Sequence, residues 1–193
     1  MKDFLKEITR TPEQEARWLN TLSLLEFIGA QKISKTVCQS HPSVEVLEHQ
    51  ADESRHAFIF KKLSLSLSKA PDYLCHDAAV TYFQILDQKL SQWITQTTGN
   101  QNTYQNYLIV TCLIERRAMK LYPLYRSVTS HDWIRDELQK IILEEANHRE
   151  IIEAKVKEIL FHHHPNNLAA CEEIEDSLFR EFASSLQRAA STS

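Results

Sequence analysis

The sequence predicts an all-α protein built from long helices. Two glycines and five prolines in 193 residues are too few for an architecture of many strands and turns. Apolar residues recur at three- and four-residue spacing through most of the chain, which is the pattern of helices that bury one face. The length suits a single domain over residues 1–193. We expect its main bundle at about 12–162 and a C-terminal helix at about 167–188.

The first long helix is predicted to begin at Pro12 and to run to about Cys38. Thr11 suits its N-cap, and Gln14 would complete a capping box. Pro123 should kink or end a later helix, and Ser130 suits the N-cap of the helix after that. The remaining helices are expected at about 43–68, 77–97, 103–122, 131–161 and 168–188. The three consecutive histidines at 162–164 point to different sides of a helix and are interpreted as a solvated helix end.

Charge and cysteine content limit the function classes. The net charge of −4 and a pI near 6.1 give no strong attraction to nucleic acid or to an anionic membrane. The uncharged run 90–114 is rich in Gln, Asn and Thr and is broken by Gly99, so we do not expect it to span a membrane. The four cysteines form no C-x-x-C pair, so we do not expect a zinc module or a disulfide framework. Their scatter favours a reducing, cytoplasmic setting. They are Cys38, Cys75, Cys112 and Cys171.

Two Glu-x-x-His pairs are the main functional signal. Glu53 and His56, and again Glu145 and His148, are three residues apart, so each pair projects from one face of a helix and can chelate a metal ion. Glu26 is the only charged residue between Arg17 and Lys32. A carboxylate on an apolar helix face costs several kcal/mol unless something compensates it. We expect a metal ion to do so, and the alternative is a glutamate angled out at the edge of the apolar stripe.

Spacing predicts that these helices form two hairpins. Glu26 and Glu53 are 27 residues apart, and Glu115 and Glu145 are 30 apart. Each interval fits half a helix, a short turn and half a helix, which places two helix midpoints side by side. The 62 residues from Glu53 to Glu115 are too many for a turn. The predicted helix at 77–97 would supply a long crossover between the hairpins.

This order of ligands resembles the ferritin-like superfamily of di-iron carboxylate proteins, which are four-helix bundles of two antiparallel hairpins with one long crossover. The segment Asp52-Glu53-Ser54-Arg55-His56 matches a motif of its oxygenase branches, whereas the second copy has Asn147 in place of arginine. The resemblance implies two iron ions, with manganese or a mixed pair as alternatives. Its implied ligands are Glu26, Glu53, His56, Glu115, Glu145 and His148.

The resemblance also implies that Asp52 and Glu144 accept hydrogen bonds from the ligand histidine of the opposite hairpin, which fixes its tautomer. His49 lies one turn before Glu53 and is either an extra ligand or a histidine at the edge of the core. Three tyrosines are interpreted mainly as packing residues, although one could reach the metals. They are Tyr104, Tyr107 and Tyr122.

The function implied is a non-haem di-iron oxidoreductase that activates dioxygen to hydroxylate or oxidise an organic substrate. It would use a small-molecule or nucleoside substrate and an external electron donor, and a homo-oligomer is possible. The segment 113–118 is similar to one in bacterial tRNA hydroxylases, which gives a second hypothesis, although the basic group Arg116, Arg117, Lys120 and Arg126 is small for a tRNA site. A ferritin-like protein that only binds or handles iron is a third.

Overall fold

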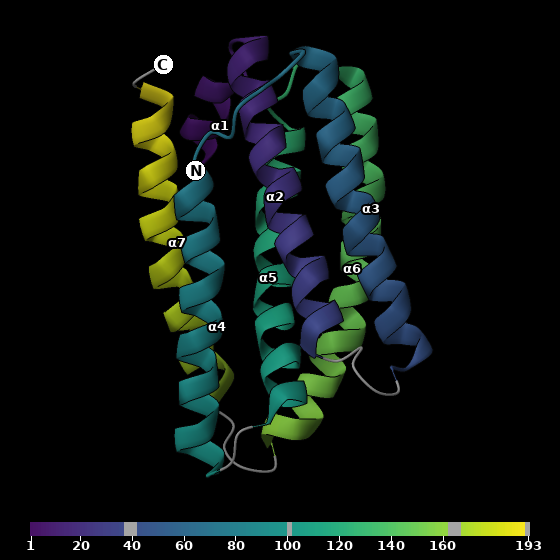
Figure 1. Ribbon diagram of the computed structural model, residues 1–193, viewed down its shortest axis with the longest axis vertical. Coiled ribbons are helices and arrows are strands. Elements are labelled where there is room, and N and C mark those ends of the chain that lie inside the picture. Colours follow the sequence, from purple (N-terminus) through teal and green to yellow (C-terminus); the bar gives the residue numbers. More distant parts are fainter. Residues whose placement is uncertain (37–41, 100–101, 162–166, 192–193) are drawn as a thin grey trace.

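The structure, a computed structural model, describes residues 1–36, 42–99, 102–161 and 167–191, and most of these residues are helical. The all-α prediction is therefore confirmed. Within these ranges the chain forms seven helices and no strand (Figure 1). They are α1 (Lys2–Ile8), α2 (Pro12–Thr36), α3 (Val44–Leu67), α4 (His76–Thr98), α5 (Thr103–Arg126), α6 (Asp132–Phe161) and α7 (Asn167–Ser191).

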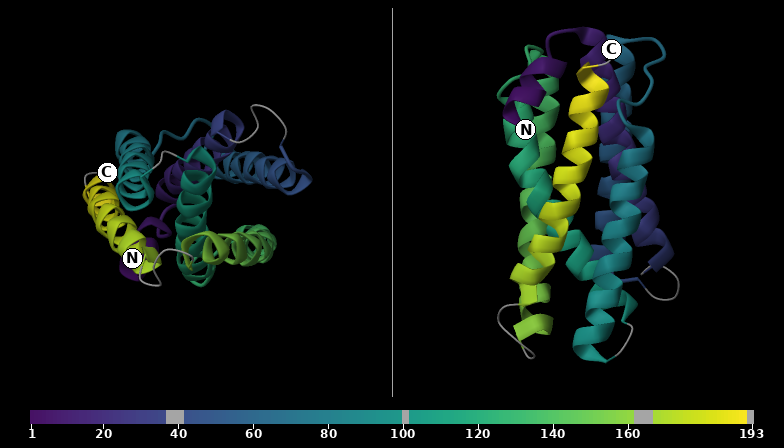
Figure 2. Two further views of the ribbon diagram at one scale, coloured as in Figure 1. Left: turned by 90° about the horizontal axis from the view of Figure 1, so that it is seen from below. Right: turned by 90° about the vertical axis from the view of Figure 1, so that its left-hand side faces the viewer.

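The long helices lie side by side along one axis. Helix α2 packs most extensively on α3, and α5 packs most extensively on α6. The helices of each pair run in opposite directions (Figures 1 and 2). Helix α4, which follows α3 and precedes α5 in the chain, returns along the length of the molecule, and α7 packs beside it. None of the helices that the structure describes is both long and apolar enough to cross a membrane.

Most helix ends agree with the predicted ones. Thr11 Oγ1 accepts a hydrogen bond from the backbone N–H of Gln14, so Thr11 caps α2 as predicted. The capping box is wrong, because the buried Oε1 of Gln14 has no partner among the described residues. Helix α6 begins at Asp132, so Ser130 lies one residue too early to be its N-cap. The predicted end at Cys38 and the histidines 162–164 fall outside the described residues.

Pro123 does not end α5, which continues to Arg126. The alternative that this proline terminates the helix is wrong. Burial of the last turn explains the difference, since Tyr125 is fully buried and its hydroxyl donates to Oε1 of Glu15 at 2.9 Å. The same carboxylate also accepts from Thr129, just beyond the helix. Tertiary contacts therefore outweigh the missing N–H of the proline.

The short helix α1 was not predicted. Its buried residues Phe4, Leu5 and Ile8 pack against the core, and the Phe4 ring meets Trp18 edge-on with centroids 5.6 Å apart. Seven residues give too few turns for a helical period to be recognised in the sequence alone.

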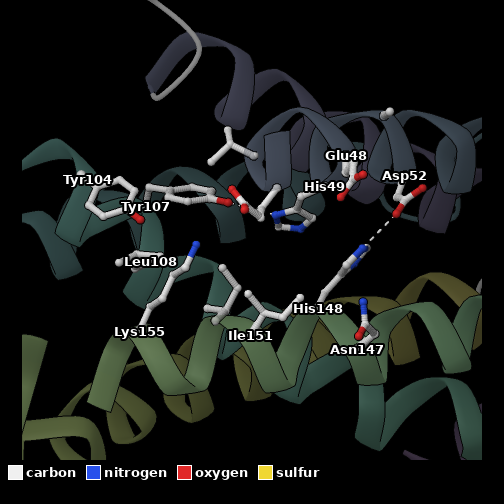
Figure 3. Close-up of a pocket in the computed structure, with 14 residues that line it drawn as sticks. Glu48, His49, Asp52, Tyr104, Tyr107, Leu108, Asn147, His148, Ile151 and Lys155 are labelled. Carbon is white, nitrogen blue, oxygen red and sulfur yellow. Dashed lines mark hydrogen bonds and ion pairs between the residues drawn. The ribbon is translucent and has the colours of Figure 1, made fainter. Parts of the chain in front are cut away.

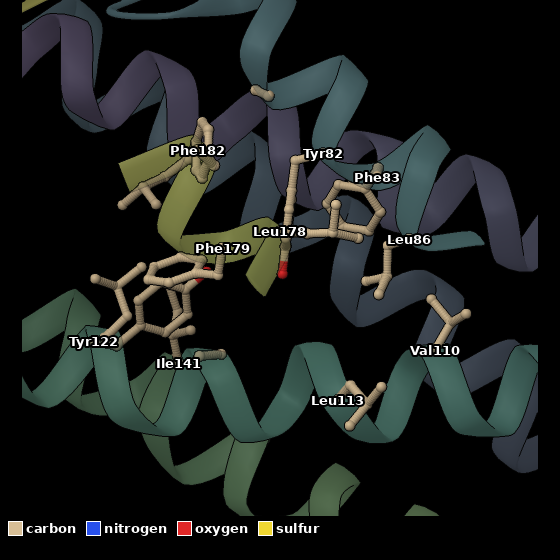
Figure 4. Close-up of a cluster of buried hydrophobic side chains, with 14 of the residues drawn as sticks. Tyr82, Phe83, Leu86, Val110, Leu113, Tyr122, Ile141, Leu178, Phe179 and Phe182 are labelled. Atoms are coloured by element: carbon tan, nitrogen blue, oxygen red, sulfur yellow. The ribbon is translucent and has the colours of Figure 1, made fainter. Parts of the chain in front are cut away.

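Helices α4 and α7 cover α5 with an aromatic layer on the side away from α3 and α6. Tyr82 of α4 stacks on Phe182 of α7 at 5.5 Å between ring centroids, and Phe179 lies beside both (Figure 4). Arg117 of α5 places its guanidinium 4.0 Å from the Phe179 ring and pairs with Glu175 of α7. This layer fixes the depth at which the middle of α5 faces α2, α3 and α6.

Candidate metal centre

All six predicted ligands, together with His49, meet inside the bundle. They come from α2, α3, α5 and α6, and none is more than 8% exposed. Their donor atoms form two groups, and within each group the atoms lie within 4.8 Å of one another. One group is Glu26, Glu53, His56 and Glu145, and the other is His49, Glu53, Glu115 and His148. Glu53 belongs to both groups, so its carboxylate lies where it can bridge two cations.

Each histidine of the two motifs is held from the opposite hairpin. The Nε2–H of His56 donates to Glu144 at 2.8 Å, and the Nε2–H of His148 donates to Asp52 at 3.0 Å (Figure 3). With Nε2 as the donor, Nδ1 of each ring carries the lone pair when the ring is neutral, and Nδ1 is the nitrogen that faces the glutamates. Both Nδ1 atoms are buried without a hydrogen bond of acceptable geometry to any described residue.

A single arginine positions both of those acids. The Arg55 guanidinium donates to the two carboxylate oxygens of Glu144 at 3.1 and 3.0 Å and to Asp52 at 2.5 Å. Partial burial would raise the pKa of Asp52, but the hydrogen bonds that Asp52 accepts from Arg55 and His148 lower it. Arg55 contacts both Asp52 and Glu144. Both acids therefore have an arginine partner, although the second motif carries Asn147 in place of an arginine.

Glu145 lies between the two histidines. Its Oε1 is 2.9 Å from Nδ1 of His56, and its Oε2 is 3.8 Å from Nδ1 of His148. Glu115 is also near, with Oε1 3.9 Å from the same His148 nitrogen and Oε2 buried without a hydrogen-bond partner among the described residues. The two carboxylate oxygens of Glu145 thus face one imidazole each. Glu145, like Glu53, therefore lies between the two candidate metal groups.

Crowding of buried carboxylates shifts their ionisation. Burial and the neighbouring Glu53 and Glu145 raise the pKa of Glu26 well above its usual range. Burial and Glu145 do the same to the pKa of Glu115. Burial would also raise the pKa of Glu145, but interactions with Glu115 and both histidines lower it instead. Burial would lower the pKa of His56, yet the carboxylate of Glu145 raises it to about 9. In the absence of a cation, protons therefore compensate part of the negative charge.

His49 points into the second group. Its Nε2 lies 3.2 Å from Oε1 of Glu53 and 3.1 Å from Oε1 of Glu115. Its Nδ1 lies 3.0 Å from the hydroxyl of Tyr107, a residue buried on α5. Of the two predicted alternatives, a ligand or a histidine at the core edge, this orientation favours the ligand, because Tyr107 can hold Nδ1 while Nε2 faces the carboxylates.

Two further residues shape the site. Tyr122, one of three tyrosines considered in the sequence, donates its buried hydroxyl to Oε1 of Glu26. Gly29 was overlooked, and a Cβ atom at that position would lie 3.0 Å from Oε2 of Glu53. The sequence does mark this position, because Gly29 is one of only two glycines and lies three residues after Glu26 inside a predicted helix. A glycine inside a helix often indicates a close approach of a neighbouring group.

A cavity of about 370 Å³ reaches the site from the side of α3, α5 and α6 (Figure 3). Its inner end is formed by His49 and His148, and its walls include Tyr107, Leu108 and Ile152. That volume lies within the range of small-molecule pockets, roughly 300–1,000 Å³. The second group of ligands is therefore the one that an organic molecule can approach.

The basic segment after Glu115 is engaged inside the protein. Arg116 pairs with Glu153 at 2.8 Å and also with Glu172. Arg117 pairs with Glu175 at 2.6 Å and also with Asp176. These ion pairs join α5 to α6 and α7, so both guanidiniums already have carboxylate partners.

Comparison of the chain with protein-family models, with curated proteins and with solved structures finds no match.

Proposed function

We propose that this protein is a non-haem di-iron oxidoreductase of ferritin-like fold that uses dioxygen to hydroxylate or oxidise an organic molecule. Manganese, or one iron and one manganese ion, suits the same oxygen and nitrogen donors. The two pairs of helices α2–α3 and α5–α6, joined through α4, agree with this fold.

The observation that carries the proposal is the orientation of the two motif histidines. In each, a carboxylate from the opposite hairpin holds Nε2–H, and the buried Nδ1 forms no hydrogen bond of acceptable geometry with a described residue, although Nδ1 of His56 lies 2.9 Å from Oε1 of Glu145. A buried polar atom without a partner costs about 1–3 kcal/mol. Two such nitrogens, each facing the glutamates of one of the two groups, are explained together if each binds a metal ion.

Charge supports two cations rather than one. Glu26, Glu53, Glu115 and Glu145 would carry four negative charges in a region where each is at most 7% exposed. Four carboxyl groups buried this close together cannot all be ionised unless positive charge compensates them. Two divalent cations would neutralise four carboxylates, and Glu53, the residue common to both groups, would help to hold both of them.

The chain's own residues have three tasks in this proposal. Asp52 and Glu144 fix the histidine tautomers, and Arg55 fixes those two acids. The apolar wall at Leu108 and Ile152 limits water and orients a substrate beside His49 and His148. Two ferrous ions, when bound, supply electrons for the reduction of dioxygen. A hydroxylation that places one oxygen atom in the substrate and one in water takes its other two electrons from the substrate, and an external donor must then return two electrons to the oxidised centre before the next turnover.

The test compares the wild type with Glu145→Ala after anaerobic loading with ferrous iron. We expect the wild type to consume dioxygen at least tenfold faster than Glu145→Ala, and to continue over many turnovers when a chemical reductant is present. Circular dichroism of both proteins controls for folding. Oxygen consumption equal to that of the variant, together with full metal loading, would show a protein that binds or handles iron without activating oxygen.

The tRNA hydroxylase hypothesis gains no support from the basic segment, because Arg116 and Arg117 are paired with carboxylates of α6 and α7. The class of substrate is therefore inferred from the residues that line the cavity.

A further inference from the structure

The pocket beside the candidate metal centre contains one basic side chain. Lys155 is the only lysine or arginine among the described residues that line the cavity. It extends from α6 into the cavity toward Tyr107 (Figure 3). The residue is half-buried, and its ammonium forms no ion pair within 4.0 Å of any described carboxylate. An ammonium directed into a cavity without a paired carboxylate is a binding group for an anion.

The register of α6 sets the distance between this cation and the metal centre. Lys155 follows His148 by seven residues, which is two helical turns, so both project from the same side of α6. The rise of an α-helix places them about 10 Å apart along the axis. Ile151 and Ile152 lie between them, and Leu108 of α5 faces the same space. The cavity is thus polar at its two ends and apolar in between.

Acidic residues at the cavity restrict the charge of the anion. Glu45 and Glu48 of α3 also line it, and both are exposed. A hydrogen bond from Ser43 and, more weakly, the charge of Lys155 lower the pKa of Glu45, so this carboxylate is ionised at neutral pH. The ammonium of Lys155 can neutralise one negative charge of a ligand, whereas the second charge of a phosphate dianion would remain uncompensated and would be repelled by Glu45 and Glu48.

We propose that the substrate is a small amphipathic carboxylic acid, whose carboxylate binds Lys155 and whose apolar body lies along Ile151, Ile152 and Leu108 toward His148. The carbon to be oxidised then lies about 10 Å from the carboxylate, which corresponds to a medium-length alkyl chain or an aryl group with a short spacer. This inference rests on the proposed oxidoreductase function in one respect, namely which end of the molecule is oxidised. The binding of the acid depends on the pocket alone.

The test is calorimetric titration with decanoate and with 1-decanol, below their aggregation limits, of both metal-free and metal-loaded protein. We expect decanoate to bind the wild type and Lys155→Met to weaken it about tenfold or more, because a charge-assisted hydrogen bond is lost. Binding of 1-decanol should be the same in both proteins. Lys157→Met, an exposed lysine on the same helix, is the matched control and should leave decanoate binding unchanged.

A second variant gives the opposite sign. Glu45→Gln removes a repelling charge and should tighten decanoate binding severalfold, a change that a merely structural role of Lys155 would not produce. Equal decanoate affinity in the wild type and Lys155→Met, or stronger binding of decyl phosphate than of decanoate, would overturn the proposal. Metal loading without decanoate binding refutes this inference alone, whereas decanoate binding to a protein that takes up no metal refutes the proposed function alone.

Discussion

The carboxylate of Glu53 on α3 lies against Gly29 of α2, so closely that a Cβ on the glycine would be 3.0 Å from Oε2. Glu53 is also the one residue shared by the two candidate metal groups. A position that has no side chain on one helix therefore sets the position of the central carboxylate on its neighbour.

Gly29→Ala should weaken metal binding while making the metal-free protein more stable. The new methyl group displaces the Glu53 carboxylate by a few tenths of an ångström, and we expect a loss of about tenfold in metal affinity, as for other residues that position ligands. Alanine in place of glycine in a helix interior stabilises it by about 0.5–1 kcal/mol. Metal titration and thermal melting measure the two effects.

The matched control is the other glycine of the chain. Gly99 ends α4 with φ of 73°, and a Cβ there would meet nothing within 4 Å. Gly99→Ala should reduce stability through backbone strain and leave metal affinity unchanged. An equal loss of metal affinity in the two variants would contradict the role assigned to Gly29.

Arg55→Met should lower metal affinity although Arg55 is not a ligand. The guanidinium holds Asp52 and Glu144, and without it both acids lose the orientation that fixes the tautomers of His56 and His148. We expect a loss of about 10- to 100-fold, the usual effect of removing a residue that orients ligands. Arg149→Met, which removes a half-exposed arginine of α6, serves as the control and should bind metal normally.

Metal uptake should release protons, and the stabilisation that the metal provides should increase with pH. The pKa values of Glu26 and Glu115 are raised above the ordinary value of 4.5, and that of His56 is raised from 6.5 to about 9. Each raised pKa contributes stability that is complete below the ordinary value and is lost as the pH rises through the folded-state value. Glu145, whose pKa is lowered, remains ionised over this range and contributes a constant amount.

The metal-free protein should therefore melt at progressively lower temperature from about pH 5 to pH 9, while the metal-loaded protein changes less. Calorimetry in buffers of different ionisation enthalpy counts the protons released on metal binding. A melting temperature that rises with pH in the metal-free protein, or metal binding without proton release, would be inconsistent with protons occupying the site.

Arg117→Met should destabilise the fold far more than Arg116→Met. Arg117 pairs with Glu175, whose side chain is only 5% exposed, and its loss would leave that carboxylate buried without its cation. Breaking a buried pair in this way costs about 3–5 kcal/mol. Arg116 pairs with Glu153 and Glu172, whose side chains are 22% and 41% exposed, so solvent can reach both carboxylates, and we expect a loss of about 1 kcal/mol. Urea unfolding of the two metal-free variants gives the comparison, and equal losses would argue against the anchoring role of Arg117.

The sequence was sufficient for the six long helices that the structure describes, although not for the short α1, and for the list of side chains that meet in the centre, because both depend on spacing along a helix. Glu53 and His56 share a face whatever surrounds them, and the intervals between motifs limit how the helices can pair. The contacts of Arg55 with Glu144 and of Tyr122 with Glu26 could not be predicted, because each joins residues about 90 positions or more apart and depends on how the helices rotate. The continuation of α5 past Pro123 also depends on tertiary burial rather than on local preference.

The most direct measurement is an anaerobic titration of the metal-free protein with ferrous iron, followed by elemental analysis of the bound metal per chain. We predict two ions in the wild type, about one in Glu26→Ala, which alters a single group, and none in Glu53→Ala, which alters both. Wild-type protein that retains no iron, or a Glu53→Ala variant that retains two ions, would contradict the proposed centre.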